Sequence, residues 1–88
     1  MEISFDPGKR DKVLRERGLD FADAATVFDG RSRTLVDDRF DYGEVRHITY
    51  GWLARDAVAI VWTERDGRCR VISMRRMHQW EIRYVGLD

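Results

Sequence analysis

Apolar and polar residues in the first third of the chain follow the spacing of two helices. Asp6 and Pro7 are typical of a helix N-terminus and Gly18 of a helix end, so residues 9–17 are predicted to be helical. A second helix is predicted over residues 21–28, where apolar side chains recur at spacings of three and four. We expect the two segments to pair as an N-terminal helical hairpin. The buried face of its second helix would be formed by Phe21, Ala24, Ala25 and Phe28.

The pattern changes after residue 33, where apolar and polar residues begin to alternate as they do in β-strands. The Asp-Gly pair at 66–67 predicts a tight hairpin turn between two of these strands. One further strand-like segment lies at the N-terminus, where residues 3–5 lead into the first helix. In the last strand the alternation places Arg70, Ile72 and Met74 on one face. The predicted strands are residues 34–36, 46–52, 58–64 and 69–74.

The C-terminal residues return to helical spacing. A stripe at three, four and three positions predicts a helix that packs on the sheet through Met77, Trp80, Tyr84 and Leu87. The expected fold class is α+β, with an N-terminal helical hairpin, a four-stranded antiparallel meander and a C-terminal helix. The helices would lie on one face of the sheet and leave the other face for a ligand or a partner. We expect one domain over residues 1–88.

The composition of the chain argues against a membrane protein, a disulfide-bonded protein and a zinc protein. The longest uncharged apolar run, residues 57–62, is far shorter than the roughly 20 residues of a spanning helix, and the first residues lack the pattern of a signal peptide. Cys69 is the only cysteine, which excludes an internal disulfide, and no Cys/His set has zinc-ligand spacing. We therefore expect a cytoplasmic protein without a membrane segment, a metal or another cofactor.

The charge distribution points toward anionic ligands. The chain has 16 basic and 16 acidic residues, yet residues 1–44 carry a net −3 and residues 45–88 a net +3. Arginine supplies 14 of the 16 basic residues, and its planar guanidinium binds phosphate or carboxylate in bidentate fashion. Codon bias would produce the same excess of arginine. The zero net charge thus conceals a dipolar chain.

Six arginines fall within 19 positions of the second half. Such a cluster is able to bind an RNA backbone and to stabilise the extra charge of a phosphoryl-transfer transition state. The alternative is a solvated rim that Glu64, Asp66 and Glu81 neutralise. The six are Arg65, Arg68, Arg70, Arg75, Arg76 and Arg83.

Three side chains are candidates for proton transfer. Glu64, where the central strand turns polar, is the first choice of base, and His78 is the second. An ordinary hairpin ion pair is the alternative role of Glu64, and a structural role is favoured for His47. An acidic cluster lacks the register of a calcium loop and is interpreted as a solvated loop, at Asp37, Asp38, Asp41 and Glu44.

Several blocks of sequence follow one another along the chain. The first half contributes Phe5-Asp6-Pro7 with Lys9, Arg17-Gly18 followed by Phe21, and Ala24-Ala25-x-Val27-Phe28-Asp29. The second half contributes Glu44-x-Arg46-x-Ile48-x-x-Gly51, Thr63-Glu64-Arg65, Arg70 to Arg76, and Glu81-x-Arg83-Tyr84. In this collinear order, over nearly the whole chain, the blocks resemble the BrnT toxins of bacterial type II toxin–antitoxin systems. The chain departs from the family pattern at Val13, Arg17 and Met77.

The resemblance implies a RelE-like fold and a metal-independent endoribonuclease that inhibits translation and growth. It also implies a BrnA-type antitoxin with a ribbon-helix-helix domain, a toxin–antitoxin hetero-oligomer, and contact with operator DNA only through the antitoxin. By this similarity Arg65, Arg75 and Arg76 would hold the scissile phosphate with Glu64 as base. The RNA-binding residues would be Lys9, Arg70, His78 and Arg83.

Two other hypotheses remain. The arginine-rich face would serve a non-catalytic binding module equally well, with nucleic acid or an acidic protein as its ligand. A purely structural subunit would neither bind nor cleave RNA.

Overall fold

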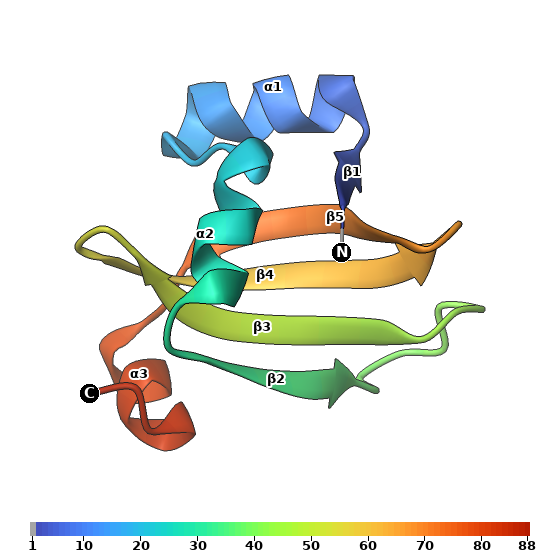
Figure 1. Ribbon diagram of the computed structural model, residues 1–88. Coiled ribbons are helices and arrows are strands. Elements are labelled where there is room, and N and C mark those ends of the chain that lie inside the picture. The colour runs from blue at the N-terminus through green and yellow to red at the C-terminus, as the bar shows by residue number, and fades with distance from the viewer. Residues whose placement is uncertain (1) are drawn as a thin grey trace.

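The computed structural model describes residues 2–88, which form a five-stranded sheet with three helices packed around it (Figure 1). The strands lie in the order β1-β5-β4-β3-β2. Helix α2 crosses one face, which we call the α2 face, and the other is called the opposite face (Figure 1). No helix within residues 2–88 is long and apolar enough to cross a membrane. The elements are β1 (Ile3–Phe5), α1 (Pro7–Arg17), the 3-10 turn η1 (Phe21–Asp23), α2 (Ala24–Asp29), β2 (Ser32–Asp37), β3 (Arg46–Leu53), β4 (Asp56–Arg65), β5 (Arg68–Arg76) and α3 (Gln79–Val85).

The prediction of a four-stranded antiparallel sheet is wrong, because the sheet is mixed and has a fifth strand. The N-terminal β1 pairs in parallel with β5, with Ile3 opposite Cys69 and Phe5 opposite Val71. The Cys69 N–H also donates to the Glu2 carbonyl at 2.7 Å. The sequence marked residues 3–5 as strand-like, but a segment of three residues carries no signal for the strand with which it pairs. The unpaired backbone edge of β5 supplies the hydrogen bonds that make the segment a strand.

The prediction of an N-terminal helical hairpin is also wrong. The ends of α1 are as expected: the Asp6 carboxylate accepts the Lys9 N–H at 3.2 Å, and Gly18 is left-handed with φ 69°. Helix α1, however, packs mainly on β5, whereas α2 packs on β3 and β2. The second helical segment also begins as the 3-10 turn η1, which changes the phase of its apolar face. Val27 is buried there and Ala25 is exposed.

The hydrophobic core fills the space between the α2 face and the helical segments. Its buried members are Leu19, which precedes η1, and residues of η1, α2, β4 and β5 that include Phe21, Val27, Ile60 and Met74. Gly51 of β3 allows α2 to approach the sheet, since a Cβ there would lie 2.7 Å from the Val27 Cγ1. The absence of a side chain at one strand position therefore sets how closely α2 packs.

The β4–β5 hairpin has the predicted tight turn and an unpredicted bulge. Asp66 and Gly67 have φ values of 55° and 74°, as a type I′ turn requires. Farther along, Val71 pairs with Trp62 and Ser73 with Val61, which leaves Ile72 as an extra residue in β5. A bulge reverses the alternation of faces beyond it. Arg70 and Met74 consequently lie on different faces of the sheet, contrary to the prediction.

Helix α3 covers one end of the opposite face, so the prediction that all helices lie on one side is wrong. The expected apolar stripe is confirmed at Leu87, which is buried, and is wrong at Trp80 and Tyr84, which are 65% and 80% exposed. Glu81 is buried instead, and its carboxylate binds Arg75 of β5 and the His78 N–H. These polar contacts turn the Glu81 side of α3 toward the sheet and the aromatic side toward solvent.

Candidate functional site

Four cationic side chains from separate segments meet at the end of the sheet that carries the β4–β5 turn. They line a hollow of about 160 Å³, which we call the basic hollow. Its lining is completed by Asp6, Glu44, Val71 and Ile72, and its cations are Lys9, Arg46, Arg65 and Arg70. Liquid water occupies about 30 Å³ per molecule, so the hollow has room for a phosphate group and the atoms beside it.

The unpredicted pairing of β1 with β5 is what builds this hollow. Arg70 lies between Ser4 of β1 and Thr63 of β4 in the register of the sheet. Because α1 begins directly after β1, its first turn brings Lys9 to the same edge. The backbone thus gathers cations that are up to 61 positions apart in the sequence, from Lys9 to Arg70.

Glu44 holds two of the four cations in place. One of its carboxylate oxygens lies 3.2 Å from the Arg65 guanidinium, and the other lies 3.2 Å from that of Arg46. These hydrogen bonds lower the pKa of Glu44, with the contribution of Arg46 the larger. Arg46 also stacks on the Tyr42 ring, 4.0 Å from its centroid. A carboxylate with a lowered pKa is a weak base, so Glu44 is suited to orient the arginines.

Arg70 differs from Arg46 and Arg65 because it has no carboxylate partner among residues 2–88. Lys9 has none either, but its side chain is exposed. The side chain of Arg70 is half-buried, whereas that of Arg65 is 51% exposed. A partly desolvated guanidinium without an internal counterion attracts an external anion more strongly than one already paired. Arg70 is therefore the strongest single attractor of phosphate in the hollow.

Arg75 and Arg76 lie away from the basic hollow and on different faces of the sheet. Arg75 pairs with Ala59 of β4, six positions before Arg65, which is about 20 Å along a strand. Arg76 points to the α2 face, where it donates to the Arg17 carbonyl and lies 3.5 Å from Asp56. Arg65, Arg75 and Arg76 therefore do not meet around one phosphate in this structure.

Arg75 has a structural partner in Glu81. The guanidinium and the carboxylate form two hydrogen bonds of 2.8 Å, and the Glu81 side chain is 8% exposed. Arg75 lowers the pKa of Glu81 to about 2, against the opposing effect of burial. The same arrangement occurs at Asp37, whose pKa Arg39 lowers to about 2. Both ion pairs stabilise the fold only while the carboxylates are ionised.

We expect the free energy of unfolding to fall as the pH is lowered from about 4.5 toward 2. The pKa of Glu81 is lowered on folding from 4.5 to about 2, so its contribution is complete above pH 4.5 and lost as the pH falls toward 2. Because Arg75 is partly exposed, we expect a loss on the order of 1–2 kcal/mol. Urea unfolding between pH 6 and pH 2.5 measures it. Glu81→Gln should flatten this slope, and an unchanged slope in that variant would contradict the assignment.

The proposed proton-transfer groups also lie outside the hollow. Glu64 pairs with Cys69 and therefore points to the α2 face, away from Arg65 and Arg70. His78 precedes α3 and stacks on Trp80 with ring centroids 6.4 Å apart. Arg83 lies in the last turn of α3. Of the predicted site residues, the structure brings together only Lys9, Arg65 and Arg70.

Sequence reasoning missed Arg46 and Glu44 as members of the site. Both stand in one of the blocks that carry the family resemblance, Glu44-x-Arg46, which was the available signal. The acidic loop around them binds cations of the chain itself: Asp37 binds Arg39, and Glu44 binds Arg46 and Arg65. Asp37 also accepts a hydrogen bond from the Tyr42 hydroxyl. Within residues 2–88, no group of three or more His, Cys, Asp or Glu side chains is arranged to hold a metal ion.

Comparison with known protein families agrees with the order of the sequence blocks. Among individually curated proteins, no sequence matches the chain. The family model for the ribonuclease toxin BrnT of type II toxin–antitoxin systems matches residues 5–81, which include every residue of the basic hollow. The chain belongs to the BrnT family of ribonuclease toxins of type II toxin–antitoxin systems.

Proposed function

We propose that this toxin cleaves single-stranded RNA without a metal ion and that the basic hollow is where the scissile phosphate binds. The observation that supports the proposal is the convergence of four cations on a space of phosphate size, with Arg70 free of any carboxylate partner in the described residues. Fixed cations aimed at a phosphate stabilise the charge that builds up on its oxygens in the transition state.

The reaction proposed is attack of a ribose 2′-oxygen on the adjacent phosphorus. A P–O2′ bond forms and the P–O5′ bond breaks, which leaves a 2′,3′-cyclic phosphate and a 5′-hydroxyl. The 2′-hydroxyl proton passes to water, and the departing O5′ takes a proton from water. Arg70 and Arg65 neutralise the phosphate oxygens, Arg46 is held beside them by Glu44, and Lys9 orients the RNA backbone. Catalysis then comes from positioning and electrostatic stabilisation.

The biological role proposed is inhibition of translation and growth in the cytoplasm, reversed by a cognate antitoxin. A type II system implies a protein antitoxin. We propose a BrnA-type antitoxin with a ribbon-helix-helix domain, which would bring the toxin to operator DNA as part of a hetero-oligomer. Growth arrest on induction of the toxin alone, and recovery when the neighbouring reading frame is co-expressed, would support this role.

The deciding experiment is incubation of the purified toxin with single-stranded RNA in excess EDTA. We expect fragments whose 5′ ends are labelled by polynucleotide kinase without prior phosphatase treatment, because the proposed reaction leaves a 5′-hydroxyl. A control in Mg²⁺ without EDTA should give the same fragments.

Two outcomes would contradict the proposal. Cleavage only when Mg²⁺ is present would overturn metal independence. Binding that weakens steeply with salt, without cleavage in either buffer, would favour the non-catalytic binding module.

A further inference from the structure

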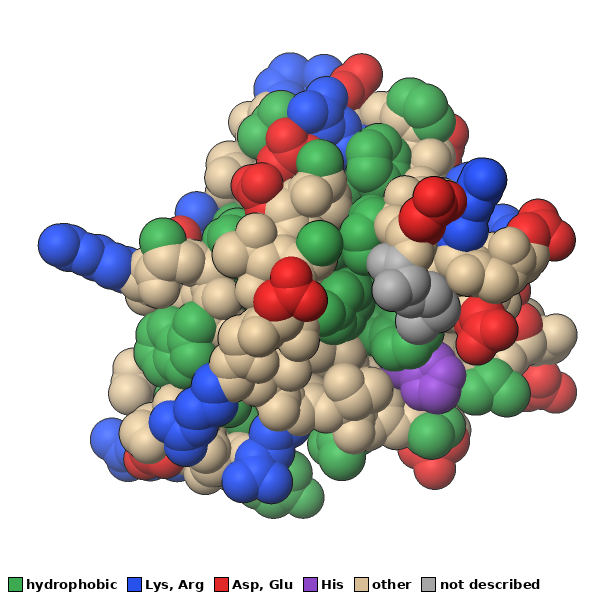
Figure 2. All heavy atoms as spheres, in the orientation of Figure 1, with side chains coloured by type: hydrophobic (Ala, Val, Ile, Leu, Met, Phe, Trp, Pro, Cys, Tyr) green, Lys and Arg blue, Asp and Glu red, His purple; other side chains and the backbone are tan. Residues whose placement is uncertain are grey.

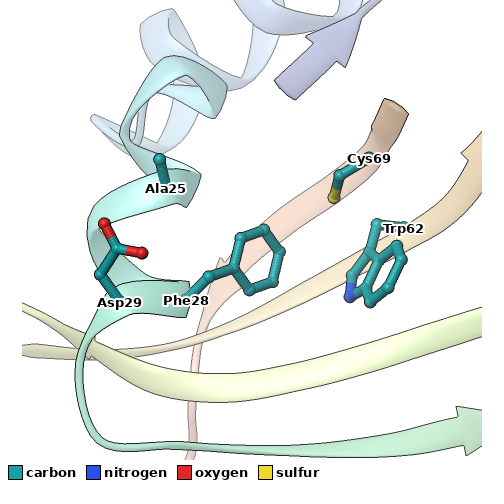
Figure 3. Close-up of a pocket in the computed structure, with 5 residues that line it drawn as sticks. All are labelled: Ala25, Phe28, Asp29, Trp62 and Cys69. Carbon is teal, nitrogen blue, oxygen red and sulfur yellow. The ribbon is translucent and has the colours of Figure 1, made fainter. Parts of the chain in front are cut away.

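A second hollow lies on the α2 face, between α2 and strands β4 and β5. It measures about 260 Å³ and is lined by Ala25, Phe28, Asp29, Trp62 and Cys69 (Figure 3). Three of these side chains, those of Phe28, Trp62 and Cys69, point toward one another across it (Figure 3). We call it the apolar hollow. Nothing in the proposed cleavage reaction uses it.

Apart from Asp29, the side chains that line the apolar hollow carry no charge. The Phe28 and Trp62 rings meet edge to face with centroids 5.7 Å apart. The indole N–H of Trp62 donates to the Thr49 Oγ1 at 2.8 Å, which fixes the ring and satisfies its only polar group. Cys69 is 1% exposed, and burial raises the pKa of its thiol to about 11, so it remains a neutral wall. The hollow is therefore preformed for an apolar group.

The rim of the apolar hollow is acidic. Asp29 lines it from α2, and Glu64 stands opposite Cys69 in the sheet and points to the same face. Neither carboxylate forms an ion pair with any side chain in residues 2–88. Figure 2 shows this face, where hydrophobic side chains form a central strip with acidic side chains on either side of it.

This combination selects a ligand that is apolar and positively charged. Carboxylates without an ion-pair partner in residues 2–88 repel the phosphates of RNA, and the basic hollow already offers RNA a better surface on the opposite face of the sheet. A protein segment that inserts an apolar side chain and carries lysine or arginine beside it would complement both features. Small apolar hollows with a polar rim are typical anchor sites for such side chains.

We propose that the apolar hollow docks a segment of the antitoxin that presents an apolar side chain flanked by lysine or arginine. This inference rests on the proposed toxin–antitoxin function and names where the partner binds. Because the apolar hollow and the basic hollow lie on different faces, changes in the first should weaken antitoxin binding while RNA cleavage is retained.

Two single substitutions at exposed positions test the proposal. Ala25→Arg fills the hollow and places a positive charge in it, and Asp29→Lys reverses the charge of its rim. The probe is the purified protein encoded by the reading frame next to that of this toxin, with affinity measured by calorimetry. We expect each variant to bind it about tenfold or more weakly, while melting temperature and RNA cleavage stay at the wild-type level.

Asp88→Lys is the matched control, since it makes the same charge change at an exposed carboxylate outside the hollow. It should bind within about twofold of wild type. Wild-type affinity in both hollow variants would overturn the inference and leave the toxin function intact. If the wild type neither cleaves RNA nor binds the neighbouring protein, the proposed function itself fails. A toxin dimer that Asp29→Lys dissociates would assign the hollow to a second copy of this chain and overturn the antitoxin assignment.

Discussion

Replacement of Arg70 by alanine is expected to lower the rate of RNA cleavage by about 10²–10³-fold, the usual cost of removing one donor that stabilises transition-state charge. Arg65 and Arg46 share the Glu44 carboxylate, so part of their charge is already neutralised. Arg70 is half-buried and unpaired within the described residues, and offers its full charge to a phosphate. The rate is measured on a single-stranded RNA oligonucleotide with toxin freed from its antitoxin.

Two comparisons make this prediction specific. Arg70→Lys keeps the charge but loses the bidentate fork, so we expect a rate between those of wild type and Arg70→Ala. Arg55→Ala removes an exposed arginine from the turn at the other end of the sheet and should leave the rate unchanged. Melting temperatures of all three variants should remain close to that of wild type. An Arg70→Ala toxin that cleaves at the wild-type rate would remove the basic hollow from the mechanism.

Replacement of Phe21 by alanine is expected to destabilise the chain by about 3–5 kcal/mol, the usual cost of truncating a buried phenylalanine. Phe21 is fully buried and meets the Phe5 ring edge to face with centroids 6.0 Å apart. It therefore ties the η1 turn to β1 and to the core beneath. A chain of this size has a total stability of roughly 4–13 kcal/mol, so the variant loses much of it.

Urea unfolding of the toxin without its antitoxin measures this effect. Phe21→Leu keeps most of the apolar volume and should cost less than about 2 kcal/mol. Phe40→Ala is the control, because that ring is 70% exposed and lies in the loop before β3. A loss below about 1 kcal/mol for Phe21→Ala would show that the core relaxes around the missing ring.

Local signals in the sequence were reliable where neighbouring residues decide the structure. Asp6 and Gly18 predicted the two ends of α1, and Asp66-Gly67 predicted the turn between β4 and β5. The alternation in residues 46–52 predicted the strand β3. These features depend on backbone conformation and on hydrogen bonds within a few residues, so the local sequence carries them.

The errors arose where distant segments decide the structure. The extra residue Ile72 reverses the faces of β5, so period-two reasoning across it misplaced Arg70 relative to Met74. The spacing of Trp80 and Tyr84 in the last helix predicted that both rings are buried. The ion pair between Glu81 and Arg75 instead orients the helix with Glu81 toward the sheet and the two rings toward solvent. A bulge and a long-range ion pair leave no periodic signal in the sequence.

The candidate site shows the same division. The arginine-rich second half and the collinear blocks of a toxin family were visible in the sequence, and the family match over residues 5–81 agrees with them. The sequence did not show which cations lie together in the basic hollow, because Lys9 comes near Arg70 only through the parallel pairing of β1 with β5. Arg75 and Arg76 are adjacent in the chain, yet the alternation of a strand sends them to opposite faces.

By itself, the sequence determined the ends of the first helix, the hairpin turn, the family and the excess of arginine in the second half. Only the tertiary structure decided which cations share a hollow, which carboxylates are paired and which face remains apolar and acidic. The physical reason is that helix caps and turns are satisfied by hydrogen bonds between near neighbours. The electrostatic potential at the basic hollow and at the apolar hollow, in contrast, comes from side chains of distant parts of the sequence that the sheet brings together.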